Sequence, residues 1–317
     1  MTAGCGYLAA GGQRSQLMVR QLSSNWFAQT SVGGSINNSL CISHHPRNSD
    51  ANSDTRLLVC NNDETIKVYS LPSLQRLTTL GLPTAVNHGT FLNDINTFIP
   101  VIASVSPDGR RLAAVGDSNQ IFIFDITAGG YYQRIATLAG TNDAGFSCSW
   151  NYSSEKLAVS SQDGFVSVWD MRYVHTTNSA APSGTSFNPS SGAPPRPSAS
   201  TASSQIHLQR DPTKLACIPS AQHPQVKGAC RTVKFSPSPS IDLLAFTEHV
   251  NYVNFVDART FDGKQSYRVS PPGTDMHLSG VCWTPDSRGV FLGLEATVLE
   301  FDVDTISRRS FPRGTLI

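Results

Sequence analysis

The chain has 317 residues with 24 basic and 23 acidic side chains, so its net charge of +1 creates no general attraction to nucleic acid or to an anionic membrane. Charged residues make up only 15% of the sequence, whereas the 24 glycines and 19 prolines suit short strands joined by many turns. No apolar run is long enough to cross a membrane, and the N-terminus lacks the basic and then apolar pattern of a signal peptide. We therefore expect a protein of the cytoplasm, the nucleus or both, with no membrane partner.

Residues 1–32 predict a set of strands that lacks its first member. Apolar segments at residues 7–10, 17–19 and 26–28 have the length and spacing of strands joined by turns. Nothing before residue 7 has the pattern of a further strand, and an unpaired strand edge is a liability for a folded protein. The missing strand leads to the hypothesis that the chain is a fragment of a larger protein.

The rest of the chain repeats one unit, in which an apolar residue and a polar turn precede an apolar strand, a second turn and a second strand. In the copy at residues 151–172, Leu157 and Val159 alternate in one strand, and the Gln-Asp-Gly turn at residues 162–164 leads to the next. The five copies end at Ser70, Asp125, Asp170, Asp257 and Asp302. The intervals between these ends are 55, 45, 87 and 45 residues, and a repeat of about 40 to 45 residues is typical of a four-stranded propeller blade. The interval of 87 must contain an insertion.

The copy that closes with a Trp-Asp pair resembles the repeats of the WD-repeat β-propeller family. The resemblance implies an all-β, WD40-type β-propeller in which residues 1–317 form a single domain. We count five recognisable full blades and a partial N-terminal blade, so the hypothetical fragment would come from a seven-bladed propeller. In this family a Ser, an Asp and the Trp hold a blade together by hydrogen bonds. Here these roles fall to Ser160 or Ser161, to Asp163 and to Trp169, although no His begins that blade.

Residues 176–204 form a segment rich in Ser, Pro, Gly and Ala. Such a segment buries too little apolar surface to offset the entropy lost on ordering, so we expect a disordered insertion within the propeller. Each doubling of loop length costs roughly 0.6 kcal/mol, which a fold tolerates. A passive spacer is the favoured interpretation, and a Pro-rich ligand or phosphorylation target is the alternative. Residues 214–218 would then supply the delayed fourth strand of the blade.

No constellation of residues predicts an enzyme, a cofactor or a metal site. The seven cysteines form no CxxC pair, and their odd number fits small buried thiols in a reducing compartment better than disulfides or zinc ligands. Residues 4–9 have the spacing of a dinucleotide fingerprint, but no strand precedes them and no helix pattern follows. A P-loop, a GxSxG elbow and an HExxH motif are all absent from the sequence.

A second resemblance lies in the blade at residues 228–260. Asp242, Leu243 and Leu244 match the short Asp-Leu-Leu signature of a poorly characterised domain in fungal and plant WD-repeat proteins. Proteins similar to this group include substrate receptors of GID-type ubiquitin ligases, in which a propeller presents the N-terminus of a target to the ligase. The resemblance implies ligase subunits and substrate peptides as partners, although a fold alone does not fix a function.

An Asp-x-Arg pattern ends two neighbouring blades, with Asp170 and Arg172 in one and Asp257 and Arg259 in the other. It resembles the paired WDxR boxes of propeller receptors that dock onto the adaptors of cullin-based ligases. An Arg at a strand end projects from one face of the disc, where its guanidinium can form bidentate hydrogen bonds to carboxylates or carbonyls of a partner. The alternative is that Asp and Arg only cap the strand end and face solvent.

The sequence therefore favours a non-enzymatic protein-interaction module, most concretely a substrate receptor or adaptor of a ubiquitin ligase. The alternative function is an RNA-associated or general assembly scaffold that carries a basic patch. RNA binding would weaken steeply as salt rises, whereas a buried peptide contact would respond much less. The patch would consist of Arg110, Arg111, Arg308, Arg309 and Arg313.

Overall fold

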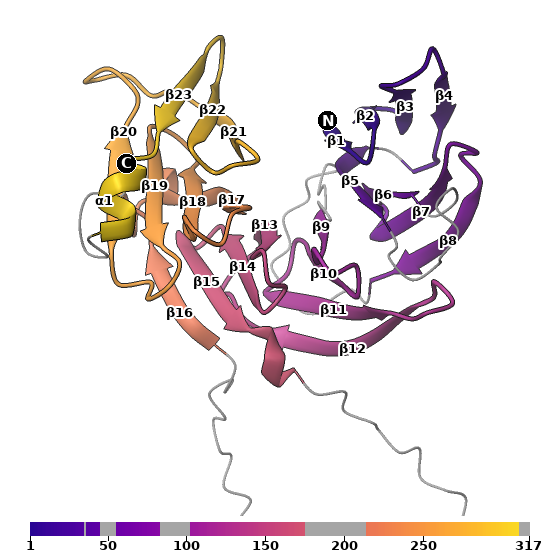
Figure 1. The fold of residues 1–317 in the computed structure, drawn as a ribbon, viewed down its shortest axis with the longest axis horizontal. Helices are drawn as coiled ribbons and strands as arrows, with labels where there is room; N and C mark the ends of the chain where they lie inside the picture. The colour runs from indigo at the N-terminus through magenta and orange to yellow at the C-terminus, as the bar shows by residue number, and fades with distance from the viewer. Residues whose placement is uncertain (35, 45–54, 83–101, 175–213, 311–317) are drawn as a thin grey trace, which may run out of the picture.

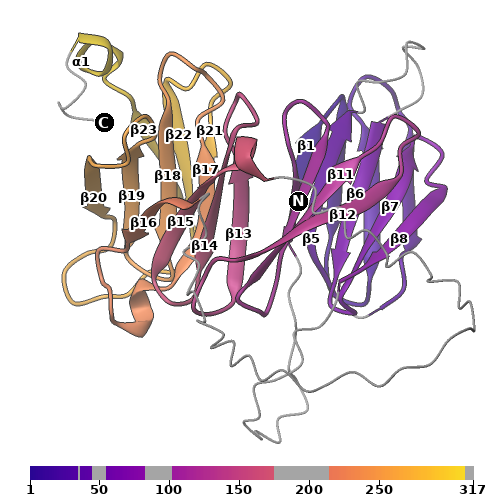
Figure 2. The same cartoon turned by 90° about the horizontal axis from the view of Figure 1, so that it is seen from below.

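The computed structural model describes residues 1–34, 36–44, 55–82, 102–174 and 214–310. Within these ranges, 23 strands form six antiparallel sheets that follow one another along the chain, each sheet a propeller blade. Figure 1 shows the blades arranged in an arc, with the first and last blades at its two ends. Figure 2, turned by 90°, shows the same blades as separate sheets standing side by side.

The first three blades have four strands each, ordered along the chain from the inside of the arc outward. Blade 1 contains β1 (Thr2–Gly4), β2 (Tyr7–Gly11), β3 (Gln16–Gln21) and β4 (Phe27–Ser31). Blade 2 contains β5 (Asn37–His44), β6 (Thr55–Asn61), β7 (Thr65–Leu71) and β8 (Arg76–Gly81). Blade 3 contains β9 (Ile102–Val105), β10 (Arg111–Val115), β11 (Gln120–Ile126) and β12 (Tyr132–Ala139).

Blades 4 and 5 repeat the four-stranded arrangement, and blade 6 has three strands among the described residues. Blade 4 contains β13 (Gly145–Trp150), β14 (Lys156–Ser161), β15 (Phe165–Asp170) and β16 (Lys214–Pro219), with the short helix η1 (Met171–Tyr173) after β15. Blade 5 contains β17 (Cys230–Phe235), β18 (Leu243–Glu248), β19 (Tyr252–Asp257) and β20 (Lys264–Arg268), and the short helix η2 (Val226–Gly228) precedes it. Blade 6 contains β21 (Leu278–Trp283), β22 (Gly289–Leu294) and β23 (Val298–Asp302), followed by the helix α1 (Thr305–Ser310).

The polar turn after the first strand of a blade is built by one recurring contact. The Ser106 hydroxyl accepts a hydrogen bond from the Arg111 amide at 2.9 Å, and the Thr284 hydroxyl accepts one from the Gly289 amide at 2.9 Å. In blade 4 the Asn151 side-chain oxygen accepts from the Lys156 amide at 2.8 Å. Each side chain replaces a backbone partner inside the turn, which is why Ser, Thr or Asn follows the apolar strand in these blades.

The hydrophobic core lies between neighbouring blades, and the sheets of blades 2 to 5 are buried on both faces. The end blades bury one face only, as in blade 1, where Leu17 is fully buried and Met18 is 41% exposed. Leu157 packs in the cluster shared with blade 3, whereas its neighbour Ala158 packs in the cluster shared with blade 5. Two tryptophans at the ends of first strands add polar ties between blades. Trp150 Nε1 donates to the Ser104 carbonyl at 3.0 Å, and Trp283 Nε1 donates to the Lys234 carbonyl at 3.1 Å.

The all-β propeller is confirmed, but the predicted blade count of five plus a partial blade is wrong. Strand β1 pairs with β2 and completes the first blade, so the described residues form six blades. The sequence does not reveal β1 because its three residues, Thr-Ala-Gly, show no apolar alternation. A seven-bladed parent protein stays a prediction.

The expected strand after the insertion is also present. Strand β16 pairs antiparallel with β15, so the fourth strand of blade 4 lies after residue 213 in the sequence. The predicted insertion at residues 176–204 lies outside the described residues, and its disorder stays a prediction.

Candidate docking site between blades 4 and 5

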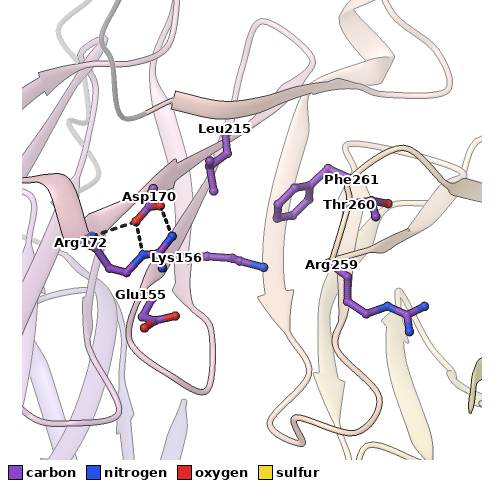
Figure 3. Close-up of a pocket in the computed structure, with 8 residues that line it drawn as sticks. All are labelled: Glu155, Lys156, Asp170, Arg172, Leu215, Arg259, Thr260 and Phe261. Carbon is purple, nitrogen blue, oxygen red and sulfur yellow. Dashed lines mark hydrogen bonds and ion pairs between the residues drawn. The ribbon is translucent and has the colours of Figure 1, made fainter. Parts of the chain in front are cut away.

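Arg172 and Arg259, at corresponding positions of neighbouring blades, line the same cavity. The cavity has a volume of about 260 Å³ and is drawn in Figure 3. We call it the arginine pocket. Its lining residues are Glu155, Lys156, Asp170, Arg172, Leu215, Arg259, Thr260 and Phe261. The two arginines predicted to act together are therefore brought to one place by the repeat.

Asp170 holds Arg172 at the end of strand β15. The buried Asp170 carboxylate accepts hydrogen bonds from the Arg172 backbone amide at 3.0 Å, from its Nε at 3.0 Å and from its Nη2 at 2.6 Å. The hydrogen bonds from Arg172 hold the pKa of Asp170 below its usual value against the smaller opposing effect of burial. The carboxylate thus stays ionised and fixes the guanidinium, while 57% of the Arg172 side chain remains exposed.

Asp257 holds Arg259 in the same way at the end of β19, with contacts of 3.0 Å from the backbone amide, 3.0 Å from Nε and 2.9 Å from Nη2. It also binds a second arginine, Arg308 of helix α1, through two hydrogen bonds of 2.8 Å. Burial alone would raise the pKa of Asp257, but the hydrogen bonds from Arg308 and Arg259 hold it well below its usual value.

Lys156 joins the two blades across the arginine pocket. Its Nζ donates to the Ala258 carbonyl of blade 5 at 2.7 Å and lies 5.3 Å from the centre of the Phe261 ring. The corresponding residue of blade 3, Arg111, donates to the Met171 carbonyl of blade 4 at 2.6 Å. A basic residue that begins a second strand is thus a recurring tie to the next blade, and here it forms the floor of the cavity.

The two guanidinium groups do not converge on a single point. Figure 3 shows the Arg172 side chain folded back over Asp170 and the Arg259 guanidinium turned away from the centre of the pocket. Two separated, positively charged forks can bind two different carboxylates or carbonyls of a partner. Asp170 and Asp257 were predicted as docking residues as well, but both are buried and engaged by arginines, so they position the arginines.

The predicted hydrogen-bond tie around Trp169 is not formed among the described residues. Trp169 is fully buried, but its Nε1 has no hydrogen-bond partner there. Ser160 donates to the Ser147 carbonyl at 3.5 Å, and Asp163 accepts from the Phe165 amide at 3.0 Å within its own turn. Trp169 is structural through packing, with the Lys214 ammonium 5.4 Å from its ring.

The Asp-Leu-Leu signature builds the interior of blade 5. Leu243 and Leu244 are both fully buried, and they point to opposite neighbours because Leu243 packs towards blade 6 and Leu244 towards blade 4. Asp242 precedes them in a left-handed conformation with φ of 41°, which Asp tolerates better than most residues. The signature residues therefore specify the start of β18, and none of them lines the arginine pocket.

The basic patch of the alternative function is not supported where the structure describes it. Arg308 is 1% exposed and bonded to Asp257, so it cannot form an open patch. Arg111 is engaged by the Met171 carbonyl, which leaves Arg110 as the one exposed member of the patch whose side chain the structure describes. The Arg309 side chain and Arg313 lie outside the described part of the chain. The sequence places Arg308 in such a patch because it does not show that α1 folds back onto blade 5.

The described residues contain no cluster of three or more His, Cys, Asp or Glu arranged to bind a metal. No helix within the described ranges is long and apolar enough to span a membrane.

Lys156 and Phe261 line the arginine pocket, although neither was predicted from the sequence as a site residue. The only sequence signal for Lys156 is its place at the start of a second strand, which Arg56 and Arg111 share in blades 2 and 3.

Two family models match parts of the chain. One, described as a WD domain, G-beta repeat, matches residues 132–170, which comprise the last strand of blade 3 and the first three strands of blade 4. The other, described as an uncharacterised protein domain (DUF2415), matches residues 228–266 in blade 5. The second match covers the blade that holds the Asp-Leu-Leu signature.

Two curated relatives and one solved structure are similar to the chain. An uncharacterized protein of Schizosaccharomyces pombe, C4G3.03, is 29% identical over 328 residues, which cover 99% of this chain and 76% of the relative. WD repeat-containing protein 1 of Xenopus tropicalis is 32% identical over 91 residues, which cover 28% of this chain and 13% of that protein. The crystal structure of Chaetomium thermophilum Sqt1, bound to the N-terminus of the ribosomal protein L10, superposes with a TM-score of 0.62 at 16% identity and covers 94% of this chain and 68% of that one.

The matches and the structure together support an all-β, WD40-type β-propeller of six blades among the described residues. Propellers of this type are rigid scaffolds whose loops and faces bind other proteins. The chain is accordingly a protein-interaction module.

Proposed function

We propose that this module is a substrate receptor or adaptor of a ubiquitin ligase, and that it docks onto a ligase subunit through the arginine pocket. The observation that carries the proposal is that Arg172 and Arg259 line one cavity at the junction of blades 4 and 5. The resemblance of both strand ends to paired WDxR boxes supports the same function. The seven free thiols fit the reducing cytoplasm or nucleus, where such a ligase acts.

The chemistry of the pocket suits a protein partner that presents acceptor oxygens. Both arginines are held in fixed directions by buried carboxylates, so less side-chain entropy is lost when a partner binds them. Arg is also a residue type that often dominates binding energy at protein interfaces. Phe261 and Leu215 add apolar contact area to the lining of the same pocket.

The test compares an Arg172→Ala/Arg259→Ala double variant with the wild-type chain in affinity purification from native cells. Loss of both guanidinium groups is expected to reduce the recovery of ligase subunits. Because it also leaves the buried Asp170 without its ion-pair partner, an Arg172→Lys/Arg259→Lys variant, which keeps both charges but not the planar forks, is purified beside it, and the melting temperatures of both variants report their folding. The matched control is Arg288→Ala, which removes an exposed arginine paired with Asp286 in blade 6, away from the pocket. Unchanged recovery of ligase subunits with the double variant would remove the docking proposal.

A second candidate function is a general assembly scaffold, favoured by the structural likeness to Sqt1, whose structure contains the N-terminus of a ribosomal protein. In this case the chain would bind a segment of a protein awaiting assembly, and ligase subunits would be absent from purified complexes. The same purification separates the two candidates, because partners of a scaffold need not depend on Arg172 and Arg259.

A further inference from the structure

The inner strands of the blades enclose a second cavity, which does not share any residue with the arginine pocket. It has a volume of about 390 Å³ and is lined by residues of β1, β5, β9, β13, β17 and β21, the first strand of every blade. We call it the central cavity. Its lining is mainly polar and includes the hydroxyl groups of Ser104, Ser147 and Thr232.

Arg231 of β17 brings a half-buried positive charge to the central cavity. Its guanidinium carbon lies 4.1 Å from the centre of the Phe146 ring of β13, in the neighbouring blade. Its Nε atom is buried and has no hydrogen-bond partner among the described residues. Partial burial lowers the pKa of Arg231. The side chain is therefore half-buried, and its Nε has lost water without gaining a hydrogen-bond partner among the described residues.

Lys234 adds a second positive charge on the same strand and lines the same cavity. Burial raises the pKa of the neighbouring Cys148 thiol, and the charge of Lys234 partly offsets that rise, which places the ammonium close to the inner strands. The charge of Arg231 acts on His249 as well, whose pKa is lowered first by burial and then by Arg231. No Asp or Glu of the described chain lines the central cavity.

A guanidinium that lies over an aromatic ring in a cation–π contact can still donate from its planar edge to an anion. A carboxylate matches that edge with two parallel hydrogen bonds, and nearby hydroxyl groups can complete its coordination. Nucleic acid fits less well, because it is bound by many cations along an extended surface, whereas this cavity holds two. The half-buried guanidinium in a polar cavity lined by no Asp or Glu thus fits a single carboxylate.

We propose that the central cavity binds the carboxylate of an Asp or Glu side chain from a partner polypeptide, with Arg231 as the main contact and Lys234 as the second. A carboxylate at this place would satisfy the buried Nε of the half-buried Arg231 and supply the counter-charge that the lining of the cavity lacks. The central cavity and the arginine pocket have no residue in common. A negative result for carboxylate binding therefore does not test the ligase proposal, and a negative result for ligase docking does not test carboxylate binding.

The test selects random peptides displayed on phage for binding to the immobilised full chain. The selected peptides are then synthesised and their affinities for the chain are measured. Enrichment of a conserved Asp or Glu is expected, and replacing that residue in the peptide by Gln or Asn should weaken binding by about tenfold or more. Arg231→Met should cause a loss of the same size without lowering the melting temperature, because the buried Nε of this half-buried side chain has no hydrogen bond to lose among the described residues. Arg231→Lys, which keeps the charge but not the planar fork, should bind with intermediate affinity.

Two controls keep the result specific. Arg288→Met removes an exposed arginine of blade 6 and should leave peptide affinity unchanged. A phosphoserine version of the winning peptide tests whether a phosphate is the true ligand. Selection without an acidic residue, unchanged affinity in Arg231→Met, or much tighter binding of the phosphoserine peptide would each overturn the proposal.

Discussion

Arg308 and Asp257 form a buried ion pair that ties the chain beyond blade 6 back to blade 5. Both Nη atoms of Arg308 lie 2.8 Å from an Asp257 carboxylate oxygen. The same guanidinium donates to the carbonyls of Ile241 and Asp242, each at 2.7 Å. Asp257 binds Arg259 as well, so one carboxylate links helix α1 to the rim of the arginine pocket.

Replacing Arg308 by Ala is expected to destabilise the propeller by about 3–5 kcal/mol, because it leaves the buried Asp257 without its main counter-charge. Denaturant unfolding of the two proteins measures the loss. Arg288→Ala is the control, since its partner Asp286 is exposed and the Arg288 Nε lies 3.7 Å from the nearest Asp286 carboxylate oxygen. Similar unfolding free energies for the Arg308 variant and the wild type would show that α1 does not pack as described.

The ion pairs of Asp257 also predict how stability depends on pH. The folded state lowers the pKa of this carboxyl, so its contribution is complete above the unfolded pKa of about 3.9 and is lost as pH falls towards the lower folded value. Asp257→Asn removes the titrating group. The melting temperature of the variant should therefore fall less steeply below about pH 4 than that of the wild type. Parallel curves for the two proteins would contradict this assignment.

The repeat and the pairing of the two arginines are predictable from the sequence because both depend on local order. Alternation of apolar residues defines the strands, and a strand end occupies the same place in every blade. Arg172 and Arg259 each follow such an end by the same spacing, so their meeting at one junction follows from the repeat.

The remaining features depend on contacts between distant segments, which no local pattern encodes. Arg308 pairs with a residue 51 positions away, and its burial requires helix α1 to fold back onto blade 5. Arg231 and Phe146 stack only because two inner strands lie side by side. Strand β1 was not predicted for a different reason, because its three residues are too few to show the alternation of apolar and polar residues that marks a strand.

Gly140 lies against the buried Trp169 ring and should not tolerate a side chain. A methyl group at this position would collide with Cζ2 of Trp169 and lie 2.7 Å from Cδ1 of Ile121. We expect Gly140→Ala to cost about 1–3 kcal/mol of unfolding free energy through overpacking. Gly81→Ala is the matched control, because no atom lies within 4 Å of its added methyl group. Equal melting temperatures for the two variants would refute the close contact.

Thiol labelling should follow the burial of the inner strands. Burial raises the pKa of Cys148 to about 12, so almost none of this thiol is ionised at neutral pH. Cys282 is exposed and also lies on a first strand, which makes it a suitable comparison. Iodoacetamide followed by peptide mass spectrometry should modify Cys282 in the native protein and Cys148 only after unfolding. Native labelling of both at similar rates would contradict the packing of blade 4.

Glu248, at the end of strand β18, anchors the segment between blades 4 and 5. Its fully buried carboxylate accepts hydrogen bonds from the Ala221 amide at 2.6 Å, from the Gln222 side chain at 3.0 Å and from the Asn254 side chain at 2.8 Å. Truncation to Ala would leave several buried donors without an acceptor, and each unsatisfied donor costs about 1–3 kcal/mol. We therefore expect Glu248→Ala to be among the most destabilising single substitutions in blade 5.

Glu248→Gln separates the hydrogen bonds from the charge, because the amide keeps one acceptor oxygen and a similar volume. Its unfolding free energy should lie between those of the wild type and Glu248→Ala. Glu300→Ala on the exposed strand β23 controls for the loss of an acidic side chain and should change stability little. If Glu248→Ala unfolded at the same denaturant concentration as Glu300→Ala, the segment at Ala221 and Gln222 would have to be held by other contacts.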